Sequence, residues 1–191
     1  MELFFVYWFI VKTVKLLVAS PSIFGDYHFQ RAVVLITEWK TSGTVGFIIN
    51  KKLENTLDEI LDDVETPFPL YYGGPVDPDN LFFIHRAAQK IPNSIPIDAN
   101  WFWSGDFNVV MELLKTKALS QEEIRFFLGY SGWSEGQLDD EIELKSWVVL
   151  EELPTFDLII TPAKSIWKKL IKKIGGPYAI WANSPENPIH N

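Results

Sequence analysis

The chain has 191 residues, with 17 lysines and arginines against 25 aspartates and glutamates, so its formal net charge is −8. Its apolar share of 47% and charged share of 22% exclude a disordered tail, a coiled coil and a collagen-like repeat. The absence of cysteine excludes a disulfide scaffold, a cysteine nucleophile and a thiolate metal site. A chain of this length is expected to form about one domain.

The chain begins with an apolar run, Leu3–Val11, that Lys12 and Lys15 interrupt. A membrane-spanning helix needs about 20 apolar residues, and a signal peptide carries positive charge before its apolar stretch. We therefore expect neither a transmembrane segment nor an export signal. Residues 1–13 are interpreted as an apolar N-terminal extension, which could be a buried strand or helix, a membrane-surface contact or a misassigned start. Residues 14–191 are interpreted as a single domain.

In the first half of the chain, β-branched and aromatic runs predict strands. These runs are Ala32–Glu38, Val45–Ile49, Leu70–Tyr72 and Leu81–His85. The polar residues between the first two runs suit a hairpin turn. Thr56 and Glu59 have the spacing of a capping box, which predicts a short helix from this point to about Asp63.

In the second half, Asp106 is expected to cap a helix that runs to about Lys117. Buried or half-buried strands are expected over Ile124–Tyr130, Trp147–Leu150 and Phe156–Ile160, with a helix from about Gly136 to Glu143. Thr161 as the N-cap and Pro162 in the first turn together predict the start of a last helix. The apolar face of this last helix comprises Ala163, Ile166, Trp167, Leu170, Ile171 and Ile174. Because strands and helices are mixed along the chain and do not form regular βαβ units, the pattern favours an α+β fold.

One stretch, Gly132–Gly136, matches the G-x-S-x-G pattern of a hydrolase nucleophile and lies between an expected strand and an expected helix. Ser134 would be the nucleophile, and Asp157 and His190 could complete a triad in chain order. The competing interpretation is that Ser134 and Gln137 form a capping box, because capping serines far outnumber catalytic ones. We favour the cap, and we expect no catalytic residue and no enzymatic activity.

Glycine-rich turns and one arginine are the candidate binding residues. The candidates are Arg31, Tyr72, Gly73, Gly74, Gly129, Gly132 and Trp133. Glycine turns can present converging N–H groups to an anion, although most are simply tight turns, and the arginine could bind an anion or pair with a carboxylate. No phosphate-binding loop is present and the three histidines share no ligand spacing, so no cofactor and no metal are expected.

The charges are segregated along the sequence. Lysines gather in the last expected helix, at Lys164, Lys168, Lys169, Lys172 and Lys173. Two other runs, 54–65 and 135–143, are acidic. The basic helix could contact DNA or an anionic membrane, or could simply be a solvated face. An acidic chain without a helix that carries base-reading Arg, Asn or Gln makes direct DNA binding doubtful.

Several stretches together resemble the YqgE/AlgH family of small bacterial proteins. They are LLVASPSI (16–23), FQRAVVLITE (29–38), GFIINKKL (46–53), YYGGPV (71–76), FFLGYSGWSEGQLDDEI (126–142) and FDLIITPAKSIWKKLIKKIG (156–175). The resemblance implies a cytoplasmic α+β domain whose mixed sheet closes into a small barrel with helices outside. It also implies the label of transcriptional regulator, with no agreed catalytic residues. In the usual family pattern, GWGAGQL, the position of Ser134 need not be serine.

The leading hypothesis is therefore a non-enzymatic cytoplasmic protein that acts by regulation or by binding a protein partner. One alternative is a small-ligand or anion-binding protein that uses the candidate residues around Tyr72 and Gly73. The other alternative is a serine hydrolase that uses Ser134.

Overall fold

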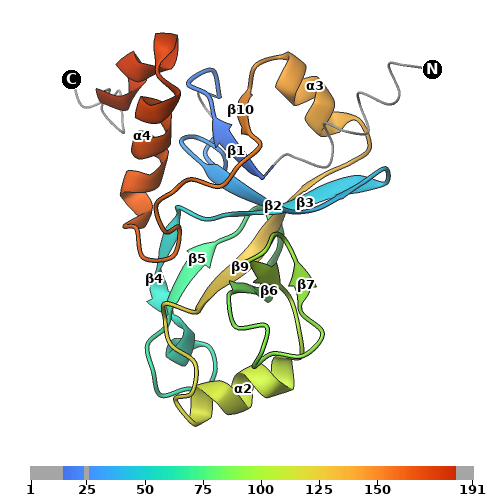
Figure 1. Cartoon of the computed structure of the whole chain (residues 1–191), viewed down its shortest axis with the longest axis vertical. Helices are drawn as coiled ribbons and strands as arrows, with labels where there is room; N and C mark the ends of the chain where they lie inside the picture. The colour runs from blue at the N-terminus through green and yellow to red at the C-terminus, as the bar shows by residue number, and fades with distance from the viewer. Residues whose placement is uncertain (1–14, 24–25, 184–191) are drawn as a thin grey trace.

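The fold is organised around one long strand, β9 (Ile124–Trp133). The computed structural model describes residues 15–23 and 26–183. The first part of β9 pairs antiparallel with β6 (Val76–His85) and parallel with β5 (Pro69–Tyr72). Its last part pairs antiparallel with β3 (Gly43–Ile48). β9 therefore joins the two ends of the molecule within one mixed sheet (Figure 1).

The remaining strands extend this sheet on both sides. The path runs β10-β1-β2-β3-β9-β6-β8-β7, and β4 is attached through β5. The bounds are β1 Leu16–Ala19, β2 Val33–Lys40, β4 Lys52–Thr56, β7 Ile95–Pro96, β8 Phe102–Trp103 and β10 Trp147–Leu150. The α+β class of a single domain is confirmed. Within the described residues the sheet does not close on itself, so the small-barrel detail is not confirmed.

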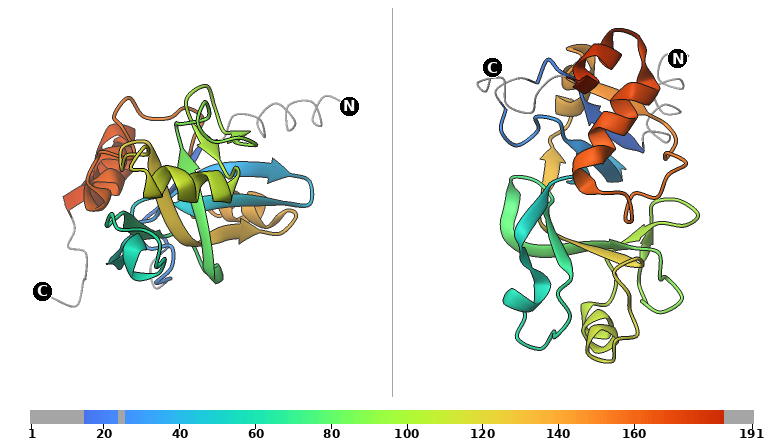
Figure 2. Two further views of the ribbon diagram at one scale, coloured as in Figure 1. Left: turned by 90° about the horizontal axis from the view of Figure 1, so that it is seen from below. Right: turned by 90° about the vertical axis from the view of Figure 1, so that its left-hand side faces the viewer.

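Helices cover the sheet at both ends of the molecule (Figures 1 and 2). They are α2 (Phe107–Lys115), α3 (Gln137–Glu143) and α4 (Ala163–Ile174), with 3₁₀ segments η1 (Leu57–Glu59) and η2 (Gly176–Asn183). α4 packs against β1, and α2 lies at the opposite end. In the described part of the chain, no helix is long and apolar enough to cross a membrane. The N-terminal extension expected over 1–13 lies outside the described residues.

Local sequence signals explain the two long helices. The Asp106 carboxylate accepts hydrogen bonds from the backbone N–H groups of Asn108 (3.0 Å) and Val109 (3.4 Å), so the predicted cap is confirmed. In α4 the predicted apolar face is confirmed, because Ile166, Leu170 and Ile171 are buried. Glycine at 175 ends this helix with a positive φ of 72°.

Tertiary contacts override the sequence pattern in two places. Thr56 stays in an extended conformation because β4 pairing continues to Thr56 opposite Pro69, and its side chain makes no cap bond. The backbone N–H of Leu57 donates instead to the carbonyl of Phe68 at 2.9 Å. The predicted capping box is therefore wrong, and only the short η1 forms.

The strand predicted over Phe156–Ile160 is also wrong, since this segment forms turns. The Asp157 carboxylate accepts hydrogen bonds from the N–H groups of Ile159 (2.8 Å) and Ile160 (3.2 Å), which folds the backbone back on itself. The following helix begins after Pro162, and no side chain caps it, so the predicted Thr161 cap does not form.

Candidate functional site

The loop between β1 and β2 is held by contacts from several distant parts of the chain. Residues Asp26–Arg31 are called the Tyr27 loop below. At its start, the Asp26 carboxylate accepts hydrogen bonds from the N–H groups of His28 (2.8 Å) and Phe29 (3.1 Å). This is the geometry of an Asx turn, which holds the backbone in one conformation.

A lysine from the segment between β3 and β4 holds the middle of the Tyr27 loop. Lys51 Nζ donates to the carbonyl oxygens of Tyr27 and His28, both at 2.9 Å. Burial lowers the pKa of Lys51, and the negative charge of Asp26 offsets part of that effect. The ammonium therefore serves as a structural donor, bound to two backbone carbonyls of the loop.

A tyrosine from β5 contacts the same loop. The Tyr72 hydroxyl lies 2.5 Å from His28 Nδ1, and the two rings stack with centroids 5.8 Å apart. Burial raises the pKa of Tyr72, and the negative charge of Asp26 raises it further. Because the phenol keeps its proton, it can donate a hydrogen bond to the His28 ring.

The far end of the loop is held by Asn50 and by α4. The Asn50 side-chain amide donates to the Arg31 carbonyl at 2.8 Å, and its Oδ1 accepts from the N–H of Val33 at 2.7 Å. Arg31 has a positive φ of 53°, a conformation that costs energy for a non-glycine residue and that this bond helps to maintain. The Arg31 guanidinium lies over the ring of Trp167, 5.0 Å from its centroid.

Phe29 anchors the loop to the interior. Its ring lies 6.0 Å from Trp133 and 5.4 Å from Trp147, centroid to centroid. Both indole N–H groups donate to the same oxygen, Glu141 Oε2 of α3, at 2.9 Å and 2.7 Å. With its neighbours held in this way, Tyr27 itself is 88% exposed. The result is a large aromatic side chain presented on a backbone that several hydrogen bonds hold in place.

The structure brings three of the seven predicted candidates to this loop. Arg31 belongs to it, Tyr72 binds its histidine and Trp133 contacts its phenylalanine. No local pattern indicates the roles of His28 and Lys51, because their contacts join segments that are far apart in the chain.

The glycines cluster nearby for a different reason. A Cβ on Gly73 would lie 2.1 Å from the Gly129 carbonyl oxygen, and one on Gly74 would lie 2.3 Å from that of Tyr130. The N–H of Gly73 already donates to the Leu128 carbonyl at 2.8 Å, and its carbonyl accepts from the Ser131 hydroxyl at 3.0 Å. Close backbone packing accounts for these glycines. A Cβ on Gly132, in contrast, would have side chains as its nearest neighbours, the Tyr130 ring at 3.1 Å and Val76 at 3.6 Å.

Ser134 lies at the turn before α3, where its N–H (3.1 Å) and its hydroxyl (3.2 Å) both bond to Gln137 Oε1. Half of the expected capping box is therefore present, since the glutamine reaches back to the serine N–H. The N-cap itself is Gly136, so the expectation that the hydroxyl caps the helix is wrong. Asp157 is bonded elsewhere, and His190 lies outside the described residues.

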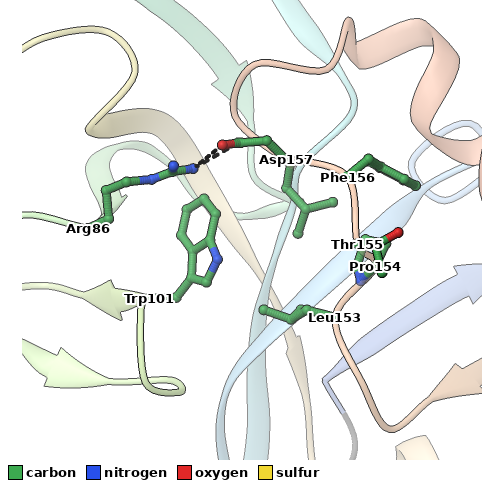
Figure 3. A pocket seen from close by; sticks show the side chains of 8 residues that line it. Arg86, Trp101, Leu153, Pro154, Thr155, Phe156 and Asp157 are labelled. Atoms are coloured by element: carbon green, nitrogen blue, oxygen red, sulfur yellow. Dashed lines mark hydrogen bonds and ion pairs between the residues drawn. The ribbon is translucent and has the colours of Figure 1, made fainter.

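A cavity of about 210 Å³ opens between Arg86 and the segment before α4 (Figure 3). Arg86 donates to both carboxylate oxygens of Asp157, at 2.8 Å and 2.7 Å, and stacks over Trp101 at 4.8 Å. Burial alone would raise the pKa of Asp157, but the bonds from Arg86 and from two backbone N–H groups lower it below its usual value. None of the seven predicted binding residues lines this cavity, which is smaller than most ligand pockets.

The structure defines a single α+β domain with a surface loop that displays an exposed tyrosine side chain. Comparison with known proteins then shows the family. The sequence profile described as AlgH-like matches residues 16–179, and the chain belongs to this family.

Close relatives include a UPF0301 protein of Chlorobium phaeobacteroides, which is 40% identical and is matched over 91% of this chain and 92% of its own length. A UPF0301 protein of Cytophaga hutchinsonii is 36% identical over 93% and 97% of the two chains. The solution structure of the AlgH protein from Pseudomonas aeruginosa has the same fold, with a TM-score of 0.70, 22% identity and coverage of 92% and 95%. The resemblance to the YqgE/AlgH family is confirmed.

Proposed function

We propose that this protein is a non-enzymatic, cytoplasmic binding protein that docks a protein partner on the Tyr27 loop. The observation that carries the proposal is the 88% exposure of Tyr27 on a backbone held by Lys51 before β4, by Tyr72 of β5 and by the core. Tyrosine is enriched among residues that dominate protein–protein binding. A loop that is ordered before binding loses little conformational entropy when the partner docks.

The surroundings of Tyr27 supply the polar contacts that such an interface needs. His28 and Asp26 are exposed beside it, and Tyr72 is partly exposed. These groups can exchange hydrogen bonds with a partner around a central aromatic contact. A regulatory role of the kind that the family label suggests would then follow from capture of another protein, without direct reading of DNA.

The test is a cross-linking pull-down of the tagged protein from its own cells, with and without nuclease. Tyr27→Ala is compared with Leu144→Ala, a control at a second exposed apolar residue (75%) on α3's C-terminal side. We expect specific, nuclease-resistant partners that Tyr27→Ala loses and Leu144→Ala keeps. Both variants should unfold within about 0.5 kcal/mol of the wild type, because both side chains are exposed.

Two results would contradict the proposal. One is a set of partners that both variants retain equally. The other is turnover of a substrate by the purified protein that a single substitution removes, which would make the protein an enzyme.

A further inference from the structure

The solvent-facing side of α4 is made almost entirely of lysine. Every exposed position of the helix is a lysine. The four central apolar residues on the opposite side are buried in the core: Ile166, Trp167, Leu170 and Ile171. The five residues are Lys164, Lys168, Lys169, Lys172 and Lys173. They are called the lysine face below.

The lysine face carries uncompensated charge. In the part of the chain that the structure describes, none of its five ammonium groups forms an ion pair. Lys169 lies over the ring of Phe156, 5.3 Å from its centroid, which keeps its charge toward an aromatic surface instead of a carboxylate. Apart from these lysines the chain has 12 cationic against 25 acidic residues, so the molecule is strongly bipolar.

Apolar side chains lie next to the lysine face. η2 follows α4 directly and packs against it, and within η2 the side chains of Ile180 and Trp181 are 78% and 48% exposed. Tryptophan and aliphatic residues beside a basic helix favour the headgroup region of a bilayer, where charge and apolar contact act together. Ile180 has no comparable role against the phosphates of a nucleic acid.

We propose that the lysine face docks this protein on an anionic lipid bilayer, with Ile180 and Trp181 at the edge of the contact. The apolar side of α4 stays buried in the core, so the helix binds through charge and does not insert. The surplus of acidic residues on the rest of the chain is repelled by the same surface, which orients the molecule with α4 toward the lipid.

The chemistry also selects against nucleic acid as the occupant. Lysine is a point charge without the forked geometry of arginine, and the exposed positions of α4 include no arginine, asparagine or glutamine that could read a base edge. Nucleic acid is therefore an outcome of the test below, and lipid is the proposal.

The experiment measures co-sedimentation of the full chain with phosphatidylcholine vesicles that contain phosphatidylglycerol, and with vesicles of phosphatidylcholine alone. Four lysines of the face (Lys168, Lys169, Lys172 and Lys173) are changed to glutamine. The matched control changes four exposed lysines elsewhere (Lys40, Lys52, Lys117 and Lys145), so both variants have the same net charge.

We expect the wild type and the control variant to bind the anionic vesicles and to lose binding steeply as salt is raised. Each lysine near an anionic surface contributes roughly a fivefold factor, so the lysine-face variant should bind about 10² to 10³ times more weakly. Circular dichroism should show both variants folded, because all eight side chains are exposed.

Three results would overturn the proposal. One is no preference of the wild type for anionic over neutral vesicles, since equal binding to both would reflect apolar residues such as 3–11 instead. Another is an equal loss of binding in the two variants. The third is salt-sensitive binding to duplex DNA or single-stranded RNA without binding to the anionic vesicles.

Discussion

Gly129 offers the sharpest test of why glycines cluster beside the Tyr27 loop. It has a φ of +68°, and an added Cβ would lie 2.5 Å from the Gly74 carbonyl oxygen and 2.9 Å from that of Val76. Alanine in this left-handed conformation costs about 1–2 kcal/mol. The clash is with backbone, so β9 and the turn after β5 must separate, which weakens a hydrogen bond worth about 1 kcal/mol. We expect Gly129→Ala to lower the free energy of unfolding by about 2–4 kcal/mol.

Gly132→Ala is the matched control on the same strand. Gly132 has no positive φ, and the nearest atom to its added Cβ is the edge of the Tyr130 ring at 3.1 Å, which can rotate away. Its unfolding free energy should change by less than about 1 kcal/mol, since alanine is a better strand residue than glycine. Urea unfolding measures the free energies of the two variants. In thermal unfolding, the Gly129 variant should melt roughly 5–15 °C below the wild type. Equal costs would refute the close-packing explanation.

Three further outcomes are expected. Burial lowers the pKa of His85, so the unfolded chain binds more protons than the folded chain as the pH falls. The contribution of neutral His85 to the free energy of unfolding is therefore complete above about pH 6.5 and is lost below it. Urea midpoints between about pH 7.5 and 5 should therefore fall less in His85→Asn than in the wild type. Asp157→Asn should cost about 1–3 kcal/mol by urea unfolding, because a half-buried arginine loses its counter-charge, whereas Asp63→Asn at an exposed pair should cost under about 0.5 kcal/mol. Ser134→Ala should cost under about 1 kcal/mol, because the serine N–H keeps its Gln137 partner, and a serine-reactive probe should not label the wild type at this position.

Elements with strong local signals could be predicted from the sequence. β2 and β3 follow from their β-branched runs. Asp106 caps α2 because its carboxylate needs only the N–H groups two and three residues further along the chain. The failures involve residues whose partners are distant in the chain. Phe156–Ile160 has a strand composition, but the Asp157 carboxylate, fixed by Arg86 from β6's C-terminal side, bends it into turns.

The candidate site divides in the same way. Arg31 and Tyr72 could be singled out because Arg31 precedes a predicted strand and Tyr72 ends one. No local pattern indicates that both take part in the contacts of one loop. His28 and Tyr72 are separated by 44 residues, and Lys51 reaches back 23 residues to the His28 carbonyl. Such a cluster exists only because β2, β3 and β5 are brought together in the folded sheet.

The two proposed surfaces can be separated by experiment, although they share a structural element. Arg31 of the Tyr27 loop lies over Trp167, and Trp167 is on the buried side of α4, whereas the lysines are on the exposed side. Removal of lysine charge should therefore leave the loop unchanged. We expect the four-lysine variant to keep the partners that Tyr27→Ala loses, and Tyr27→Ala to bind anionic vesicles as the wild type does. If each variant instead lost both kinds of binding, the two surfaces would be parts of one interface, and the protein partner would itself depend on the membrane.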